Sequence, residues 1–372
     1  MTLRGRPTLR TLDRYLGIPV IALLGLRAKR PMPSEIRRIG VLRTAAIGEV
    51  LLISAILSDL RKAFPSADIA MITGEGNAEM GALVARGRCR HVQVHVSKPL
   101  RSARALQRER FDILIDTGPW PRFDAVLTAM SGARFTIGFS SRNQARHFAY
   151  DLAVPHSRDV HEVENFRSLI RPLGITASSP PGLQLNGAEA PASLPTGPHI
   201  VFHPWSGGYR AHLREWPEDR WANLAHGLRH VEATVLISGG PGDALKSEAL
   251  ADAIRHKGIA CVSIAGMPIE PIIPVLKSST LVVGVNTSIT HLASILEAPT
   301  VMLHGPTSPL RWGPLGSRSA SVCSVLPGCG FVHHGFEYKG QREDCMLGVH
   351  VGAVLEGVRS VLEQAPQSSI SG

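Results

Sequence analysis

The sequence lacks the short motifs that mark the commonest nucleotide-dependent and hydrolytic enzymes. Its 372 residues contain no GxxxxGKS/T phosphate loop, no GxSxG nucleophile elbow and no HExxH zinc motif. Gly74-Glu75-Gly76 follows a predicted strand but lacks the third glycine of a dinucleotide-binding fingerprint. These absences argue against a P-loop enzyme, an α/β-hydrolase and a zinc protease of the common types.

Aromatic residues and long apolar runs are also scarce. Aromatic residues make up 5% of the chain and hydrophobic residues 44%, which suits a soluble α/β protein with enough chain for two domains. The apolar run at residues 16–26 is too short to span a bilayer core of about 30 Å as a helix. No small-residue cleavage site follows it, which argues against a secretory signal.

The five cysteines form no CxxC pair and are odd in number. This pattern predicts reduced thiols in a reducing compartment, and hence a cytoplasmic protein. An alternative is a zinc site at Cys329, His333, His334 and Cys345, although their spacing matches no common pattern. We therefore expect no metal site.

The net charge of +10 is concentrated in two segments. Residues 1–38 carry nine basic residues against two acidic ones, and residues 84–110 carry eight against one. Such local patches do not predict nucleic-acid binding. The first predicts that an arm at residues 1–36 lies on an anionic membrane surface, at the inner face of the cytoplasmic membrane. The alternative is an arm packed on the protein's own surface.

The second basic segment includes Arg86, Arg88 and Arg90. One interpretation is that it attracts a phosphorylated or lipid-linked glycan acceptor. The other is a solvated helix face without a ligand.

Short apolar runs alternate with helical patterns from residue 39 onward. This rhythm is typical of βαβ units and predicts parallel sheets. Helices are predicted from about Glu49 to Phe64 and at 351–364. The predicted strands cover 39–43, 68–73, 91–96, 111–116, 134–139, 199–203, 233–239, 260–265, 281–285 and 300–304.

Residues 176–198 are rich in Pro, Gly, Ser and Ala and are interpreted as a linker. It would join an N-terminal domain at 37–175 to a C-terminal domain at 199–348, followed by a helix and tail at 349–372. Open parallel sheets bind ligands beyond the carboxyl ends of their strands, so both domains are expected to contribute to one site.

An uncharged polar junction lies where the predicted strand 281–285 runs into the next helix. It consists of Asn286, Thr287 and Ser288. The first N–H groups of a helix are unpaired and its dipole is positive there, so small polar residues let a phosphate approach the backbone. The alternative is ordinary helix capping, for which the same residue types are preferred. His291, one turn into the helix, is either a site residue or a core residue.

Three other loops at strand ends add groups that suit a nucleoside diphosphate. PWSGGYRAHLREWP (204–217) supplies Ser206 and Gly207 in a glycine-rich turn, followed by the basic Arg214. GGPGD (239–243) places Asp243 where a carboxylate can hold ribose hydroxyls, and GPTSPLRWGP (305–314) follows the last predicted strand.

In the first half, Glu49 begins a helix after the first strand. It is either a partner of the helix dipole or a general base for an acceptor hydroxyl.

Taken in order, five of these motifs resemble glycosyltransferase family 9, the ADP-heptose:lipopolysaccharide heptosyltransferases. They are RTAAIGEVLL (43–52), REWP (214–217), GGPGD (239–243), VNTSITHLA (285–293) and HGPTSPLRWGP (304–314). The similarity covers roughly residues 37–363. It implies the GT-B fold, an α/β architecture of two Rossmann-like domains with parallel sheets facing a central cleft. The acceptor would bind the N-terminal domain and the nucleotide sugar the C-terminal one.

The resemblance also implies a function. It indicates an inverting transfer that needs no metal and no cofactor, moving heptose from ADP-heptose to a lipopolysaccharide core or another cell-surface glycan. Glu49 stands where the family has Asp, Arg214 where it has Lys, and Asn286-Thr287-Ser288 where it has Asp-Thr-Gly. Two alternatives follow from these departures: a transferase that uses another nucleotide sugar, and a non-catalytic protein that binds one.

Overall fold

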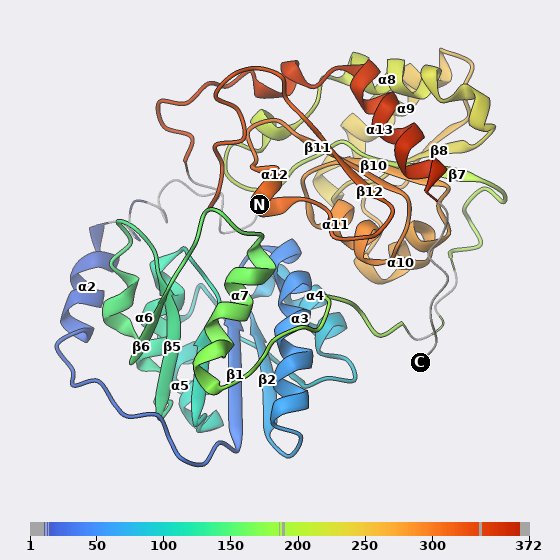
Figure 1. Ribbon diagram of the computed structural model, residues 1–372. Coiled ribbons are helices and arrows are strands. Elements are labelled where there is room, and N and C mark those ends of the chain that lie inside the picture. Colours follow the sequence, from blue (N-terminus) through green and yellow to red (C-terminus); the bar gives the residue numbers. More distant parts are fainter. Residues whose placement is uncertain are drawn as a thin grey trace. The chain divides into compact units, whose positions relative to one another are not determined.

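A computed structural model describes residues 11, 13, 15–185, 187, 190–334 and 337–364. The chain divides into two compact units, Met1–Gln184 and Leu185–Gly372. Within the described residues each unit is built on one parallel sheet of six strands (Figure 1). The predicted α/β fold is confirmed, and no described helix is long and apolar enough to cross a membrane.

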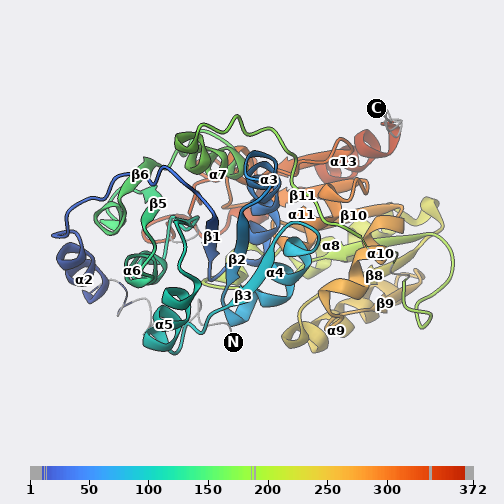
Figure 2. The same cartoon turned by 90° about the horizontal axis from the view of Figure 1, so that it is seen from below.

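The N-terminal sheet has the strand order β3-β2-β1-β4-β5-β6, and every neighbouring pair is parallel. The chain moves outward from β1 to β3 and then returns to β4 on the other side of β1. Because such crossovers are right-handed, this reversal places the later helices on the opposite face. Helices α3, α4 and α7 pack on one face, and α2, α5 and α6 with the short 3₁₀ helix η3 on the other (Figures 1 and 2).

The elements of this unit have the following bounds. The strands are β1 (Arg38–Arg43), β2 (Asp68–Thr73), β3 (Arg90–Gln93), β4 (Ile113–Asp116), β5 (Phe135–Ser140) and β6 (Leu152–Pro155). The helices are α2 (Gly17–Leu24), α3 (Ile47–Ala63), α4 (Ala78–Ala85), α5 (Pro99–Glu109), α6 (Arg122–Met130) and α7 (Glu162–Ile170), with 3₁₀ turns η2 (Glu75–Asn77), η3 (Arg146–Ala149) and η4 (Arg171–Leu173).

The C-terminal sheet has the same plan, with the order β12-β11-β10-β7-β8-β9 and parallel pairing throughout. Its strands are β7 (His199–His203), β8 (Thr234–Ile237), β9 (Cys261–Ser263), β10 (Leu281–Val285), β11 (Thr300–His304) and β12 (Ser319–Cys323). Its helices are α8 (Glu218–Gly227), α9 (Ala244–Arg255), α10 (Ile269–Ser278), α11 (Ser288–Ile295), α12 (Pro309–Trp312) and α13 (Val351–Glu363), with η5 (Ala211–Arg214), η6 (Arg229–Val231), η7 (Pro241–Asp243) and η8 (Cys345–Gly348).

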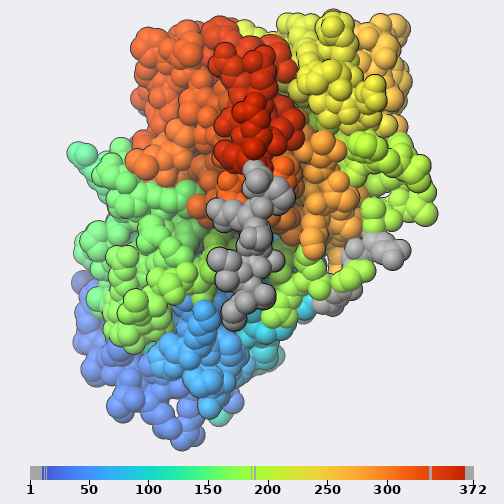
Figure 3. Space-filling view, turned by 45° about the vertical axis from the view of Figure 1, so that its right-hand side comes forward, coloured from blue at the N-terminus to red at the C-terminus, as the bar shows by residue number. Residues whose placement is uncertain are grey.

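The central strands are buried on both faces, as parallel sheets require. Every residue of β10 and β11 is buried. On one face of the C-terminal sheet, Trp221 packs between Phe202 and Trp216, with ring centroids 5.1 Å apart in both pairs. Helix α13, red in Figure 3, covers β11 and β12 through Val354, Val358 and Val361, whose spacing places them on one side of the helix.

The structure differs from the sequence-based expectations at several segments. Strand β3 is Arg90–Gln93, shorter than the predicted 91–96, and β6 and β12 were not predicted. The predicted linker begins as a packed segment, because Ser179 N–H donates to Asp59 Oδ1 at 3.0 Å and Gly182 N–H to Ser54 Oγ at 2.9 Å. Of the predicted arm and tail, residues 1–10 and 365–372 lie outside the described part of the chain.

Candidate active site

The N-terminal unit offers its polar side chains at the point where the strand order reverses, between β1 and β4. Ligands bind at such switch points in open parallel sheets. Three residues, Thr44 to Ala46, connect β1 to α3, and Ala46 adopts φ 69° so that the helix begins abruptly. Glu49 is the third residue of α3 and is buried, with 8% of its surface exposed.

The Glu49 carboxylate is held by Arg43, the last residue of β1. The Arg43 side chain is buried and forms an ion pair with Glu49 Oε2. Its remaining N–H groups donate to the carbonyls of Ala45 (2.9 Å) and Thr117 (3.4 Å). Arg43 therefore joins the loops after β1 and β4 and fixes the direction of the Glu49 side chain.

Two buried aspartates, Asp116 and Asp124, lie at the same end of the sheet as this ion pair. Asp116, the last residue of β4, accepts hydrogen bonds from Arg146 (2.5 Å) and the Tyr150 hydroxyl (2.6 Å). Asp124 on α6 accepts from the hydroxyl and N–H of Thr44. Burial, together with the nearby charge of Asp116, raises the pKa of Asp124 to about 6. This end of the sheet is thus a network of buried charges in which Glu49 is the least buried carboxylate.

The C-terminal unit has its own switch point, between β7 and β10. The loop after β7 contains Ser206, Gly207 and, in η5, Arg214. The Arg214 guanidinium donates to the carbonyl of Gly207, which folds the loop back on itself. The Ser206 hydroxyl and Arg214 Nε are buried without a hydrogen-bond partner in the structure. Buried polar groups are normally paired, so two donors without partners in one loop suit an anionic ligand.

Asp243 lies on the neighbouring loop, after β8, and its carboxylate forms a hydrogen bond and an ion pair. Its carboxylate accepts from the Gly240 N–H at 2.8 Å and pairs with Lys246 at 3.0 Å. Lys246 also contacts Glu215 (3.1 Å) and lies 4.2 Å from the centre of the Trp205 ring. Burial lowers the pKa of Lys246, but hydrogen bonds to Asp243 and Glu215 outweigh it and raise the pKa. The loops after β7 and β8 are therefore joined by one charged cluster.

Asn286, Thr287 and Ser288 lie where β10 ends and α11 begins, as the sequence predicts. Thr287 is the residue before the helix, yet its side chain makes no capping hydrogen bond. The first N–H groups of α11 therefore have no side-chain cap, and Ser288 at this helix start is half-buried. The Asn286 amide is turned toward the loop after β11, where its nitrogen donates to the Trp312 carbonyl at 3.1 Å. His291 is buried within α11.

Two buried histidines end the strands on either side of β10. His203 bonds Ser238 Oγ at 2.8 Å, and His304 contacts Thr307 Oγ1 at 3.2 Å. Burial lowers the pKa of each to about 4. Both imidazoles are therefore neutral near pH 7, and the positive charge of this unit's site comes from Arg214, Lys246 and the helix start.

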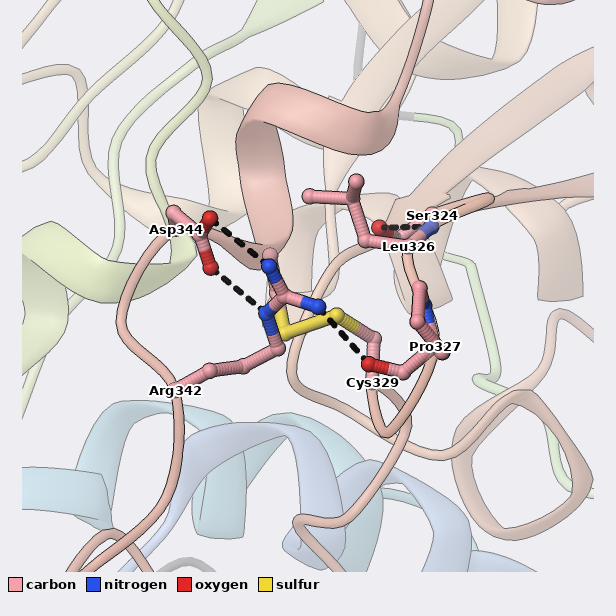
Figure 4. Close-up of a disulfide and its surroundings, with 7 residues drawn as sticks. Ser324, Leu326, Pro327, Cys329, Arg342 and Asp344 are labelled. Carbon is pink, nitrogen blue, oxygen red and sulfur yellow. Dashed lines mark hydrogen bonds and ion pairs between the residues drawn. A yellow bond between two sulfur atoms is a disulfide. The ribbon is translucent and has the colours of Figure 1, made fainter.

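A disulfide joins Cys329 to Cys345 (Figure 4). The expectation of reduced thiols is wrong for this pair, because segments too far apart in sequence for a CxxC motif meet beside the loop after β11. The bond also removes both sulfurs from the alternative zinc set. Within the described residues no group of three or more His, Cys, Asp or Glu side chains could hold a metal ion.

The disulfide anchors a segment that pairs with the loop after β11. Arg342 reinforces it, binding Asp344 through two N–H groups and the Pro327 carbonyl at 2.8 Å (Figure 4). Beyond Cys329, the Val332 N–H donates to the Pro306 carbonyl at 2.7 Å, and the Ser308 N–H to the Val332 carbonyl. Gly305 lies close to this segment, because a Cβ at this position would overlap the Met346 side chain and force it to move.

Side chains of the predicted acceptor patch bind other residues of the same protein. Arg90 pairs with Asp68 (2.8 Å) and Glu109 (2.7 Å), and Arg88 donates to Ser58 Oγ (3.0 Å). Arg86 is half-buried. Arg90 therefore ties β3 to β2 and α5, and Arg88 reaches α3. Further exposed cations of this segment lie along α5.

Sequence reasoning missed several residues that the structure places at these sheet edges: Arg43, Asp116, Asp124, Arg146, Tyr150, Glu215 and Lys246. A usable signal existed for two of them. Arg43 and Asp116 are charged residues at the last position of otherwise apolar strands, which places them at the carboxyl edge of the sheet. The others come together only through the fold.

Comparison with known proteins supports one family. Residues 100–330 match the model of glycosyltransferase family 9 (heptosyltransferase). Lipopolysaccharide heptosyltransferase 1 of Escherichia coli strain K12 is 26% identical over 309 residues, which cover 77% of this chain and 93% of that protein. The enzyme of the same name from Pseudomonas aeruginosa is 26% identical over 332 residues, covering 83% and 90%.

Solved structures show the same fold. The E. coli ADP-heptose lps heptosyltransferase II aligns with a TM-score of 0.71 and 18% identity over 88% of this chain and 98% of that one. The E. coli heptosyltransferase WaaC, solved with ADP, aligns with a TM-score of 0.65 and 20% identity over 87% and 99%. The two six-stranded parallel sheets thus match the GT-B structures of heptosyltransferases.

Proposed function

Because the chain belongs to glycosyltransferase family 9, we propose that it transfers a heptose or related sugar from ADP-heptose to a lipopolysaccharide core or another cell-surface glycan. Relatives named lipopolysaccharide heptosyltransferase 1 and the solved complex of WaaC with ADP support this choice of donor. The structural feature that best supports this proposal is the loop that contains Ser206 and Arg214. It holds two buried hydrogen-bond donors that have no partner.

The C-terminal unit would bind the nucleotide part of the donor. Ser206, the Gly207 backbone and Arg214 would contact the diphosphate, together with the start of α11 at Thr287 and Ser288. Asp243 would hold the ribose, since its carboxylate retains lone pairs beyond those used by Gly240 and Lys246. Asn286 and His291 complete the proposed donor site.

The N-terminal unit would bind the acceptor and supply the base. Glu49 removes the proton from an acceptor hydroxyl, whose oxygen forms a bond to the anomeric carbon on the face opposite the leaving group. The bond from that carbon to the diphosphate oxygen breaks through an oxocarbenium-like transition state, and configuration inverts. Arg214 and the helix start stabilise the charge that develops on the departing ADP. Protein cations and dipoles supply this stabilisation without a metal.

We also propose that the protein works in the cytoplasm, at the inner face of the cytoplasmic membrane. A glycolipid acceptor would be held there. A second donor remains a competing proposal because Asn286 and Ser288 depart from the family's Asp-Thr-Gly, so the test includes several nucleotide sugars.

The decisive experiment combines turnover with donor binding. Glu49→Gln retains the size of the side chain but cannot accept a proton, so kcat should fall by about 10²–10⁴-fold. Its affinity for ADP should stay unchanged, because Glu49 and the nucleotide lie on different units. Arg214→Ala should weaken ADP binding, measured by calorimetry, and Arg214→Lys should restore part of it.

Three results would contradict the proposal. Near-normal turnover by Glu49→Gln would reduce that residue to a helix-end charge. ADP binding by Arg214→Ala as tight as that of the parent would remove the diphosphate assignment. Turnover of another nucleotide sugar in strong preference to ADP-heptose would replace the donor.

A further inference from the structure

Helix α2 has no polar face, yet most of it is exposed. Its sequence, GIPVIALL, contains no polar side chain. A helix that is apolar all round is normally buried in a core or in a membrane. Here only Ile21 is fully buried, against Ala125, Ala149 and Tyr150. Leu16, Leu23 and Leu26, in and around the helix, are 59%, 70% and 80% exposed.

The neighbouring helix α6 extends this apolar surface. Helix α2 packs along α6, since Gly17 lies against the Arg122 side chain at one end and Arg27 reaches the Ala129 carbonyl at the other. Phe123, Val126 and Met130 of α6 are only partly buried. Their spacing of three and four residues places them on one side of α6.

Helix α5, on the other flank of α6, supplies positive charge. Its Gln107 side chain donates to the Met130 carbonyl at 2.9 Å, which ties the two helices together. Lys98, Arg101, Arg104 and Arg108 are exposed and recur every three or four residues, so they form a stripe along α5. The acidic Glu109 of this helix is paired with Arg90 at 2.7 Å.

The basic residues that follow α2 make contacts within the protein. Arg30 pairs with Asp151 at 2.7 Å, Lys29 donates to the Tyr150 carbonyl at 2.7 Å, and Arg27 to the Ala149 carbonyl at 3.0 Å. These contacts hold the arm on the N-terminal unit. The sequence-based prediction assigned the arm's own charges to the membrane, whereas in the structure these three basic residues attach α2 to the protein.

We propose that the layer formed by α2, α6 and α5 docks on an anionic lipid bilayer. The exposed apolar side chains of α2 enter the boundary between headgroups and acyl chains, and the α5 stripe lies against lipid phosphates. An apolar helix face bordered by cations has the chemistry of an interfacial membrane anchor. The proposal rests on the proposed function only in taking the acceptor to be a membrane glycolipid, and it is independent of the sugar transferred.

The test is cosedimentation of the full-length protein with vesicles that contain no glycolipid. Vesicles of phosphatidylglycerol and phosphatidylcholine should bind it, and vesicles of phosphatidylcholine alone should bind it much less. The double variant Leu16→Ser/Leu23→Ser should lose most binding. The triple variant Arg101→Gln/Arg104→Gln/Arg108→Gln should bind roughly 100-fold more weakly, and its residual binding should depend less on salt.

Matched controls come from the C-terminal unit. Leu245, on α9, is 90% exposed, and Lys257, Lys277 and Arg359 are exposed cations. Leu245→Ser and the triple variant Lys257→Gln/Lys277→Gln/Arg359→Gln should bind vesicles as the parent does. Thermal unfolding should show that all four variants remain folded, since each change is on an exposed side chain.

Several results would overturn the proposal. One is a parent protein that does not sediment with anionic vesicles, and another is an equal loss of binding in the control variants. A parent that is dimeric by light scattering and becomes monomeric in Leu16→Ser/Leu23→Ser would show that a second copy covers this surface. Turnover with a lipid-free acceptor, measured in the same variants, separates this question from the proposed function: its absence in the parent would contradict the function and leave the vesicle result standing.

Discussion

Glu49 and Asp124 are two carboxylates at one sheet edge whose surroundings differ. Glu49 pairs with the Arg43 guanidinium and keeps 8% of its surface exposed, so an acceptor hydroxyl can approach it. Asp124 is fully buried, and its partners are the hydroxyl and N–H of Thr44. Since burial and the charge of Asp116 raise its pKa to about 6, protonation is favourable there. Asp124 has no exposed surface, so of these two carboxylates only Glu49 can reach an acceptor hydroxyl as a base.

The raised pKa of Asp124 predicts a pH dependence of stability. Its folded pKa of about 6 lies above the unfolded value of about 3.9, so its contribution is complete below pH 4 and is lost as the pH rises through 6. Asp124→Asn imitates the protonated acid at every pH. The free energy of unfolding of this variant, relative to the parent, should therefore rise between pH 4 and pH 7.

A matched control for this measurement is Asp112→Asn. Burial raises the pKa of Asp112, but hydrogen bonds from the N–H groups of Arg37 and Arg38 outweigh it and lower the pKa. Its contribution is present above the unfolded pKa and lost as the pH falls, so this variant should lose stability relative to the parent as the pH rises. Urea unfolding at several pH values would show both signs, and parallel curves for the two variants would contradict the assignment.

The side chain of Asn286 is expected to affect which nucleotide sugar the protein uses. Its amide nitrogen donates to the Trp312 carbonyl, a bond that a carboxylate cannot make. Asn286→Asp should therefore loosen the loop after β11 and change the ratio of kcat/KM between competing nucleotide sugars more than it changes ADP affinity. Steady-state kinetics with two or more donors in both proteins would decide this. Equal ratios would make Asn286 a structural helix-end residue only.

At the scale of elements, the sequence predicts strands best where both faces are buried. Strands β2, β7, β10 and β11 coincide with their apolar runs, because parallel central strands are apolar on both sides. The missed strands β6 and β12 lie at sheet edges, where one side has no partner strand. Leu152–Pro155 ends in proline and Ser319–Cys323 is mostly small and polar, so neither has the composition of a typical strand.

The residues of the candidate site were also predictable from sequence only in part. Loops at the carboxyl ends of strands could be found from sequence, since the βαβ rhythm determines which end of each strand bears the ligand. The partners of those residues could not, because Lys246 reaches Glu215 and Arg146 reaches Asp116 across 31 and 30 residues of chain. Such pairs depend on side-chain packing, which periodicity does not encode.

The disulfide predicts an element-scale effect on the loop after β11. It closes a loop with a sequence separation of 16 residues, for which chain entropy gives about 3 kcal/mol of stabilisation. Reduction, or Cys345→Ser, should lower the melting temperature and weaken ADP binding, because the segment at 330–332 that pairs with Gly305 and Pro306 becomes freer.

The control for this prediction is Cys323→Ser, which removes an exposed free cysteine at the end of β12. It should change neither quantity, and its response to reductant should equal that of the parent. Identical melting of oxidised and reduced parent protein would contradict a structural role for the bond.

On the scale of the whole molecule, the chain consists of two units that each have a sheet and a core of their own. A domain with its own core can in principle fold alone. We expect residues 185–372, expressed separately, to fold and to bind ADP with an affinity similar to that of the full chain. Circular dichroism and calorimetry would check this. A folded fragment that fails to bind ADP would show that the first unit contributes to the nucleotide site.

The close contact of Gly305 with Met346 has a consequence for the history of the sequence. A side chain introduced at 305 would overlap the Met346 side chain in its present position, so the methionine would have to move. Substitutions at these positions should therefore be accepted more readily in combination, with a smaller residue at 346 accompanying a larger one at 305. Across homologous chains the two positions should vary together although they lie 41 residues apart in the sequence.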